Sequence, residues 1–343
     1  MKFGTVPVRE AAGLIAAHSV KAGAISLRKG NPILPEIAAG LQHAGVREVV
    51  AVTLEAGDVG EDAAAERLAG RLTGAGLRRD APFTGRCNLF AVENGLLQVG
   101  RAGIDAVNAV DEAITVATLA PFKPVVAGEM VATVKIIPYA VPGGLLDEAC
   151  AAADPGLLGI APYRLARVGV VSTMLPGLKD ATIDKTLRNL RHRLAPTGAA
   201  IVAERRVPHA PEAVAEALAR VIADGAEIAV IFGASAIADR RDVIPAGIEA
   251  AGGTVAHLGM PVDPGNLLLV GARGGVPVIG APGCARSPKE NGFDWVLQRL
   301  LAGLPVTRAD IVALGVGGLL MEIVSRPQPR AGGASAASDE DDA

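Results

Sequence analysis

The stretch EIAVIFGASAIADRRDVIPAGIEAAGG, residues 227–253, decides the fold predicted for this chain. Its apolar beginning, Glu227–Phe232, is typical of a buried strand, and a loop of small residues follows at Gly233–Ala236. Asp242–Ala251 is then predicted to be a helix. A strand, a loop and a helix in this order form the first part of a βαβ unit, so the stretch predicts a parallel sheet.

The same alternation continues on both sides of this stretch. Strands are predicted at 167–174 and 199–207, and a helix begins at Pro211, where a missing N–H costs nothing. Further extended segments are predicted at 254–258 and 276–279. Repeated units of this kind predict an α/β fold, with a mostly parallel sheet and helices on both faces in three α/β/α layers.

Composition narrows the class of protein. The chain has 343 residues, enough for two or three domains, and it is 50% hydrophobic but only 3% aromatic. A formal net charge of −3 gives no reason to expect nucleic acid as a partner. No charge-free apolar run reaches the roughly 20 residues that a membrane helix needs, and the three cysteines form no CxxC pair. We therefore expect a cytoplasmic protein without a membrane partner.

Two clusters of Pro and Gly, at 142–144 and 154–156, place a domain boundary near Gly159. The segment after Arg326 is small and acidic, which predicts disorder. The predicted organisation is an N-terminal α+β domain over 1–159, an α/β domain over 160–325 and a disordered tail over 326–343.

Two local patterns describe the N-terminal domain. Asn94-Gly95, between two apolar runs, predicts the turn of a β-hairpin. The residues from Ile104 to Leu119 have the pattern of a helix.

Three loops at predicted strand ends are candidates for binding, because ligands of such sheets lie beyond the carboxyl ends of the strands. They are 172–184 (STMLPGLKDATID), 232–242 (FGASAIADRRD) and 280–291 (GAPGCARSPKEN), the last preceded by GARGG at 271–275. Glycines in such loops let backbone N–H groups approach an anion closely. The basic residues that surround the loops, and that are suited to pairing with phosphate, are Arg240, Arg241, Arg273, Arg286 and Lys289.

Structural interpretations of the same residues stay open. Asp242 is equally suited to capping the helix that it precedes, and Asp184 to complementing a helix dipole in the first turn. Arg240 and Arg241 fit an ordinary solvated surface. Cys284 is typical of a small buried residue. The histidines (His18, His43, His192, His209 and His257) show no spacing of metal ligands, and all are interpreted as ordinary.

The three loops, in this order and spacing, resemble the Mog/MoaB family of molybdopterin-binding domains. The stretch 232–253 resembles the family's TGGTG…RRDVTP segment, with Asp242 on its aspartate. GVPVIGAPGCARS at 275–287 resembles the LPGNP segment, and the first loop places Asp184 on an acidic position. The resemblance covers about residues 167–303. Phe232, Ala234 and Ala236 depart from the family's threonine and glycines, and PGCA replaces PGNP.

The resemblance implies a Mog-like fold and a role in molybdenum cofactor biosynthesis, as a transferase that adenylylates molybdopterin or inserts molybdenum. It implies molybdopterin and Mg²⁺ as ligands, with ATP or molybdate as co-substrate. Asp242 and Asp184 would be catalytic and hold the metal. The residues implied in binding the cofactor are Ser172, Thr173, Gly233, Ala234, Ser235, Arg273, Gly274, Pro282 and Gly283.

A non-catalytic alternative fits the same resemblance. The protein would then be a carrier that presents molybdopterin to a separate cytidylyltransferase or molybdoenzyme. VREAAGLIAAHSV with SLRKGNPI, and GVGGLLMEIVSRPQPR near the end, resemble segments of proteins in which a molybdopterin-binding region precedes a cytidylyltransferase domain. No GGxSxRMG-type nucleotide loop is present, so we expect that enzyme to be another polypeptide. Related domains often associate, so a homo-oligomer is also an expectation.

Overall fold

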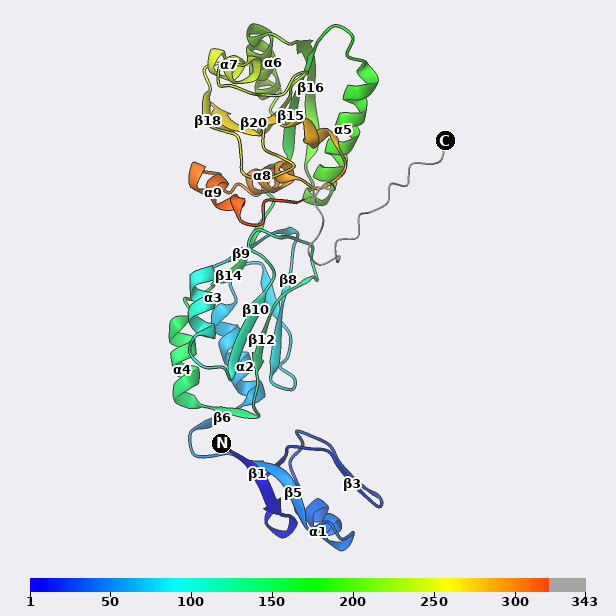
Figure 1. The fold of residues 1–343 in the computed structure, drawn as a ribbon, viewed down its shortest axis with the longest axis vertical. Helices are drawn as coiled ribbons and strands as arrows, with labels where there is room; N and C mark the ends of the chain where they lie inside the picture. Colours follow the sequence, from blue (N-terminus) through cyan, green and yellow to red (C-terminus); the bar gives the residue numbers. More distant parts are fainter. Residues whose placement is uncertain (321–343) are drawn as a thin grey trace, which may run out of the picture. The chain divides into compact units, whose positions relative to one another are not determined.

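The computed structural model describes residues 1–320, and the chain divides into two compact units. The first is Met1–Tyr163 and the second begins at Arg164 (Figure 1). Gly159, near which the boundary was predicted, lies in strand β14 (Leu158–Pro162), which pairs with β9 (Gly95–Val99) of the first unit. The predicted tail at 326–343 lies outside the described residues.

The first unit is α+β, and its strand ladders are antiparallel. One hydrophobic cluster gathers residues 8–51 and a second gathers residues 64–160. The remaining strands are β1 (Lys2–Pro7), β2 (Ile15–Ala16), β3 (Val20–Ala22), β4 (Ile25–Leu27), β5 (Glu48–Thr53), β6 (Asp58–Gly60), β7 (Leu77–Arg79), β8 (Arg86–Ala91), β10 (Ile114–Thr118), β11 (Pro124–Val125), β12 (Met130–Ile136) and β13 (Ala140–Pro142). The helices are α1 (Pro35–His43), α2 (Glu61–Leu72), α3 (Arg101–Asn108) and α4 (Gly143–Ala152).

Both local predictions for this unit need correction. The strands on either side of Asn94 do not pair with each other, because β8 pairs with β7 and β12 while β9 pairs with β11 and β14. Gly95 allows β9 and β14 to pack closely, because a Cβ there would collide with the Ala161 carbonyl oxygen. The predicted helix from Ile104 ends at Asn108, whose side chain hydrogen-bonds both the N–H (2.7 Å) and the carbonyl (3.0 Å) of Val116 in β10.

The second unit is built on a six-stranded, mostly parallel sheet, as the sequence predicted. The strand order is β16-β15-β17-β20-β19-β18, and the first four strands are parallel. The strands are β15 (Arg167–Met174), β16 (Ala200–Pro208), β17 (Ile228–Phe232), β18 (Thr254–Leu258), β19 (Leu269–Arg273) and β20 (Val276–Ala281). The helices are α5 (Asp180–Leu194), α6 (Pro211–Ala223), α7 (Val243–Ala250), α8 (Gly292–Leu301) and α9 (Arg308–Val312).

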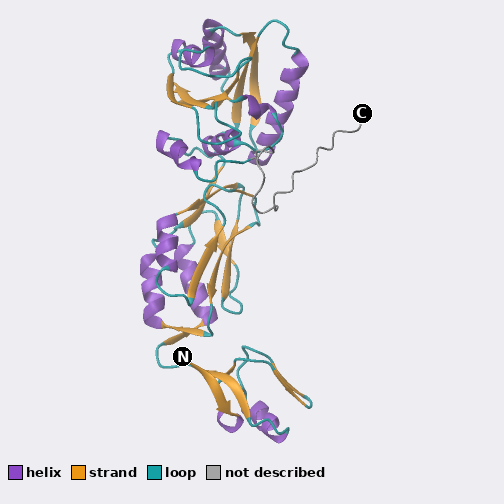
Figure 2. Cartoon of the chain, viewed as in Figure 1, coloured by secondary structure: helices purple, strands orange, loops and turns teal. Residues whose placement is uncertain are grey.

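Helices cover both faces of this sheet (Figures 1 and 2). Helices α6 and α7 pack on one face, over a cluster that includes Val171 and Ile231. On the other face, α8 places Phe293 against Phe232, with ring centroids 6.4 Å apart. Helix α5 lies on this second face too, since Thr186 contacts the guanidinium that stacks on Phe232. The α/β class and the layers are therefore confirmed.

The chain reverses its direction across the sheet between β15 and β17. Helix α5 carries it from β15 to β16, and α6 carries it back past β15 to β17. A reversal of this kind is a topological switch point, where loops diverge to opposite faces and leave a crevice at the carboxyl ends of the strands. No helix within residues 1–320 has both the length and the apolar character that a membrane crossing requires.

Candidate functional site

The candidate site is the carboxyl edge of β15, β17 and β20. Ser172 and Thr173 lie near the end of β15, the loop from Gly233 follows β17, and Pro282-Gly283 follows β20. Because these strands are parallel and adjacent, the three sequence-predicted loops begin at one edge of the sheet.

Thr173 joins the two strands that flank the switch point. Its buried Oγ1 accepts a hydrogen bond from the Ala234 amide at 2.7 Å and lies 2.9 Å from Nδ1 of His209. Since Oγ1 accepts the amide proton, its own proton is free to be donated to Nδ1. In the neutral tautomer whose Nδ1 accepts from Thr173, Nε2 carries the proton of the ring.

In the loop after β17, Ala234 and Ala236 stand where the Mog/MoaB pattern has glycines, and the backbone there is compatible with alanine. Among the described non-glycine residues only Thr84 and Phe122 have positive φ, so Ala234 and Ala236 carry no left-handed strain. Gly233 is constrained by space instead, because a Cβ there would lie 2.5 Å from the Ser235 carbonyl oxygen and 2.7 Å from Ile244. The departures from the family pattern therefore leave the backbone of this loop unstrained.

Arg286, after β20, supplies a cation at this edge. Its Nη1 donates to Thr186 Oγ1 at 3.0 Å, and its Nη2 donates to the Gly233 carbonyl oxygen at 2.8 Å. The guanidinium carbon lies 5.6 Å from the centre of the Phe232 ring. Within the described part of the chain it forms no ion pair with a carboxylate. Burial lowers the pKa of Arg286 below its usual value, as expected for a cation without an anionic partner.

Helix α5 holds the segment that carries Arg286. Asn189 donates to the Arg286 carbonyl oxygen at 2.6 Å. Arg193 donates to the carbonyl oxygens of Ala285 (3.0 Å) and Ser287 (2.6 Å), and its Nε donates to Asp294 at 2.5 Å. The side chains of both members of this ion pair are about nine-tenths buried (9% and 10% exposed). The position of Arg286 therefore depends on a buried ion pair between α5 and α8.

Arg273 and Gly274 do not belong to this edge, which corrects their assignment to the anion pocket. Strand β19 runs antiparallel to β20, so Arg273 pairs with Val276 at the beginning of β20. The intervening Gly274-Gly275 is a hairpin turn in which both residues have positive φ. At about 3.3 Å per residue, Arg273 is about 13 Å along β19 from Leu269, which lies beside the carboxyl end of β20. Arg273 donates to the Ala251 carbonyl oxygen instead.

The two carboxylates assigned to magnesium already have partners from the chain itself. Asp242 caps α7, accepting the Val243 amide (2.8 Å) on Oδ1 and the Ala238 amide (3.1 Å) on Oδ2. Asp184 accepts Nη2 of Arg206 at 2.6 Å. Among the described residues no group of three or more His, Cys, Asp or Glu is arranged to hold a metal. These side chains do not fit a magnesium site. Capping describes the contacts of Asp242, whereas Asp184 lies beyond the first turn of α5 and is held by an ion pair instead.

We expect Asp242→Ala to lower the free energy of unfolding of the second unit by about 1 kcal/mol, because it removes an N-cap. Asp242→Asn should cost much less, since asparagine caps helices as well as aspartate does. Denaturant titration followed by the fluorescence of Trp295, the one tryptophan of the chain, measures both. Equal losses for the two variants would show that the negative charge, rather than the cap, is what stabilises the fold.

His209, Asn189 and Arg193 were missed by the sequence analysis. His209 directly follows β16, so its position at a strand end is the signal that was present. Asn189 and Arg193 lie in the second half of α5, about 100 residues from their partners (97 and 101). No local pattern marks such a contact.

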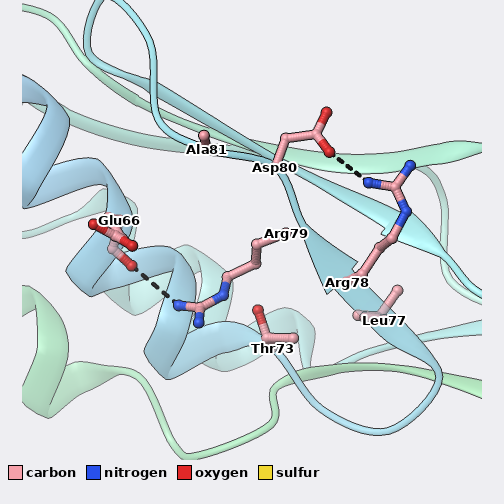
Figure 3. A pocket seen from close by; sticks show the side chains of 7 residues that line it. All are labelled: Glu66, Thr73, Leu77, Arg78, Arg79, Asp80 and Ala81. Atoms are coloured by element: carbon pink, nitrogen blue, oxygen red, sulfur yellow. Dashed lines mark hydrogen bonds and ion pairs between the residues drawn. The ribbon is translucent and has the colours of Figure 1, made fainter.

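The first unit has a cavity of about 390 Å³ beside α2. Figure 3 shows that Arg79 turns toward the carbonyl of Glu66 while Arg78 turns toward Asp80. The two guanidinium groups point away from each other, so this cavity offers no convergent binding groups.

The second unit is thus a doubly wound α/β domain with the Arg286 guanidinium at the switch-point edge of its sheet. No family model matches the sequence, and no curated protein matches it. The chain is similar to the molybdopterin biosynthesis MoeA protein from Pyrococcus horikosii, with 15% identity, 88% of this chain and 75% of that chain covered, and a TM-score of 0.31. It is also similar to the molybdopterin biosynthesis enzyme MoaB from Thermus thermophilus, with 20% identity, 41% and 99% covered, and a TM-score of 0.28. Both TM-scores are below 0.5, so these likenesses do not assign a family.

Proposed function

We propose that the second unit binds molybdopterin, a phosphorylated pterin, at the carboxyl edge of its sheet. The observation that carries the proposal is the switch point between β15 and β17, where the three loops of the Mog/MoaB resemblance begin beside a cation without a carboxylate partner. Crevices at switch points are where sheets of this class bind their ligands. A partly buried cation without a carboxylate partner favours an anionic ligand, such as a phosphate group.

In this proposal each loop has its own task. The Ala234 amide is already bonded to Thr173, so the backbone N–H groups offered to the ligand are those of the exposed Ser235 and Gly283, and Pro282 is buried. Thr173 orients His209, whose Nε2–H becomes a hydrogen-bond donor to the ligand.

The contacts of the two aspartates favour the carrier over the transferase. Both carboxylate oxygens of Asp242 accept hydrogen bonds from backbone amides, and Asp184 forms an ion pair with Arg206. A metal bound at these oxygens would compete with the cap of α7 or with the Arg206 ion pair. We therefore propose that the protein shelters molybdopterin and presents it to a separate enzyme, a cytidylyltransferase or a molybdoenzyme.

The expected result for the native protein is co-purification with a pterin. The protein is purified without exposure to air, then denatured and oxidised, and its fluorescent pterin derivatives are measured. Binding predicts a pterin content that approaches one per chain under saturating supply. If the protein has no pterin and takes up none from a molybdopterin source, the proposal is wrong.

A second assay separates the carrier from the transferase. The loaded protein is incubated with ATP and Mg²⁺, and pyrophosphate and adenylylated pterin are measured, with molybdate added in a parallel reaction. A carrier should give neither product nor molybdenum insertion. Turnover that disappears in Asp242→Asn, in which the cap is retained, would establish the transferase instead.

A further inference from the structure

A row of four residues crosses the sheet just below the candidate site. Arg206, Ser172, Phe232 and Ala281 are register partners on β16, β15, β17 and β20. Neighbours in register on parallel strands point to the same face, and here that is the face of α5, because Arg206 pairs with Asp180 and Phe232 stacks under Arg286. Ser172 therefore lies beside the ring on which the Arg286 guanidinium is stacked.

Ser172 is the unusual member of this row. It is only 1% exposed, and its Oγ has no hydrogen-bond partner within residues 1–320. A buried hydroxyl without a partner is destabilising, and such groups are rare in folded proteins. Its neighbour Thr173, by contrast, has both partners described above. The unsatisfied hydroxyl indicates that a group from outside the chain completes this position.

The two arginines near this row differ in their partners. Arg206 is saturated, since its guanidinium donates to Glu204 and Asp180 at 2.8 Å and to Asp184 at 2.6 Å. Arg286 donates only to two neutral oxygens, those of Thr186 and Gly233. A guanidinium has five N–H donors, so donors of Arg286 are left for an anion. The positive charge near this row that has no carboxylate partner is therefore that of Arg286.

We propose that the Arg286 guanidinium and the Ser172 hydroxyl form an oxyanion subsite that binds the terminal phosphate of the ligand. The chemistry is that of any tetrahedral oxyanion: the guanidinium supplies charge-assisted donors and the serine supplies one neutral donor. Identification of the organic part of the ligand as a pterin rests on the proposed function. The subsite makes affinity depend on the phosphate and not on the pterin ring alone.

The test titrates inorganic phosphate into the full chain and follows heat or Trp295 fluorescence. Saturable binding to the native protein is expected. Arg286→Met should weaken it by about 10- to 100-fold, the value of a charged hydrogen bond, and Ser172→Ala by about 2- to 10-fold. Arg273→Met is the matched control, since that arginine lies at the other edge of the sheet, and it should leave binding unchanged. Arg286→Met also removes the hydrogen bonds to Thr186 and Gly233, so its unfolding midpoint is measured beside the titration to separate lost binding from lost fold.

A second arm uses the oxidised, fluorescent molybdopterin derivative before and after phosphatase treatment. The phosphorylated form should bind more tightly to the native protein, and Arg286→Met should abolish the difference. Equal binding of both forms, or phosphate binding that is absent or indifferent to Arg286→Met, overturns the subsite and leaves pterin binding standing. Phosphate binding that depends on Arg286, with no affinity for either pterin, supports the subsite and overturns the proposed function.

Discussion

Replacing Arg193 with methionine is expected to lower the free energy of unfolding of the second unit by about 3–5 kcal/mol. Breaking a buried ion pair from one side leaves an uncompensated charge, and losses of this size are typical. Here the remaining charge is Asp294, whose side chain is 10% exposed. The change also removes the donors to the Ala285 and Ser287 carbonyl oxygens, so the loop that carries Arg286 loses its support from α5.

The exposed pair Arg241–Asp239 provides the control for this prediction. Its ion-pair distance of 2.7 Å resembles that of Arg193–Asp294, but the Arg241 side chain is 92% exposed. Exposed pairs contribute about 0–1 kcal/mol, so Arg241→Met should hardly change stability. Both variants are measured by denaturant titration with Trp295 fluorescence, which reports on the second unit. Similar small losses in the two variants would mean that solvent reaches the Arg193 pair.

Phe232→Ala is expected to cost about 3–5 kcal/mol, the usual loss for a phenylalanine in a packed core. Phe232 is 1% exposed and packs on Phe293 from α8. It is also the residue that replaces the family's threonine, and its ring lies under the Arg286 guanidinium. The variant should therefore weaken phosphate binding in addition to stability.

Val312→Ala serves as the comparison, because Val312 is 58% exposed and its truncation should cost less than about 0.5 kcal/mol. Stability is again read from Trp295, and phosphate affinity from the titration described above. If Phe232→Ala is destabilised but binds phosphate as tightly as the native protein, the ring contributes packing only and does not support the cation.

Local chemistry was enough to predict the α/β unit. A short apolar run bounded by turn residues, such as 228–232, favours a buried strand by its length, and amphipathic spacing indicates α6 from Pro211 onward. These patterns depend on neighbours along the chain, so strand β15 was predicted at the bounds that the structure gives it. The wrong Asn94-Gly95 hairpin prediction shows the limit of local patterns. The glycine is needed there because a side chain would collide with a carbonyl of β14, and not because the chain forms a hairpin turn.

The sequence by itself determined the βα alternation and the three loops at strand ends, because side-chain periodicity and turn residues act over a few positions. Only the tertiary structure decided which side chains lie beside those loops and which of them already have partners. The antiparallel course of β19 moves Arg273 to the far edge, and the capping of α7 occupies Asp242. Ser172 is left without a hydrogen-bond partner and Arg286 without a carboxylate partner among the described residues, because contacts between distant segments form only when the whole sheet and its helices are in place.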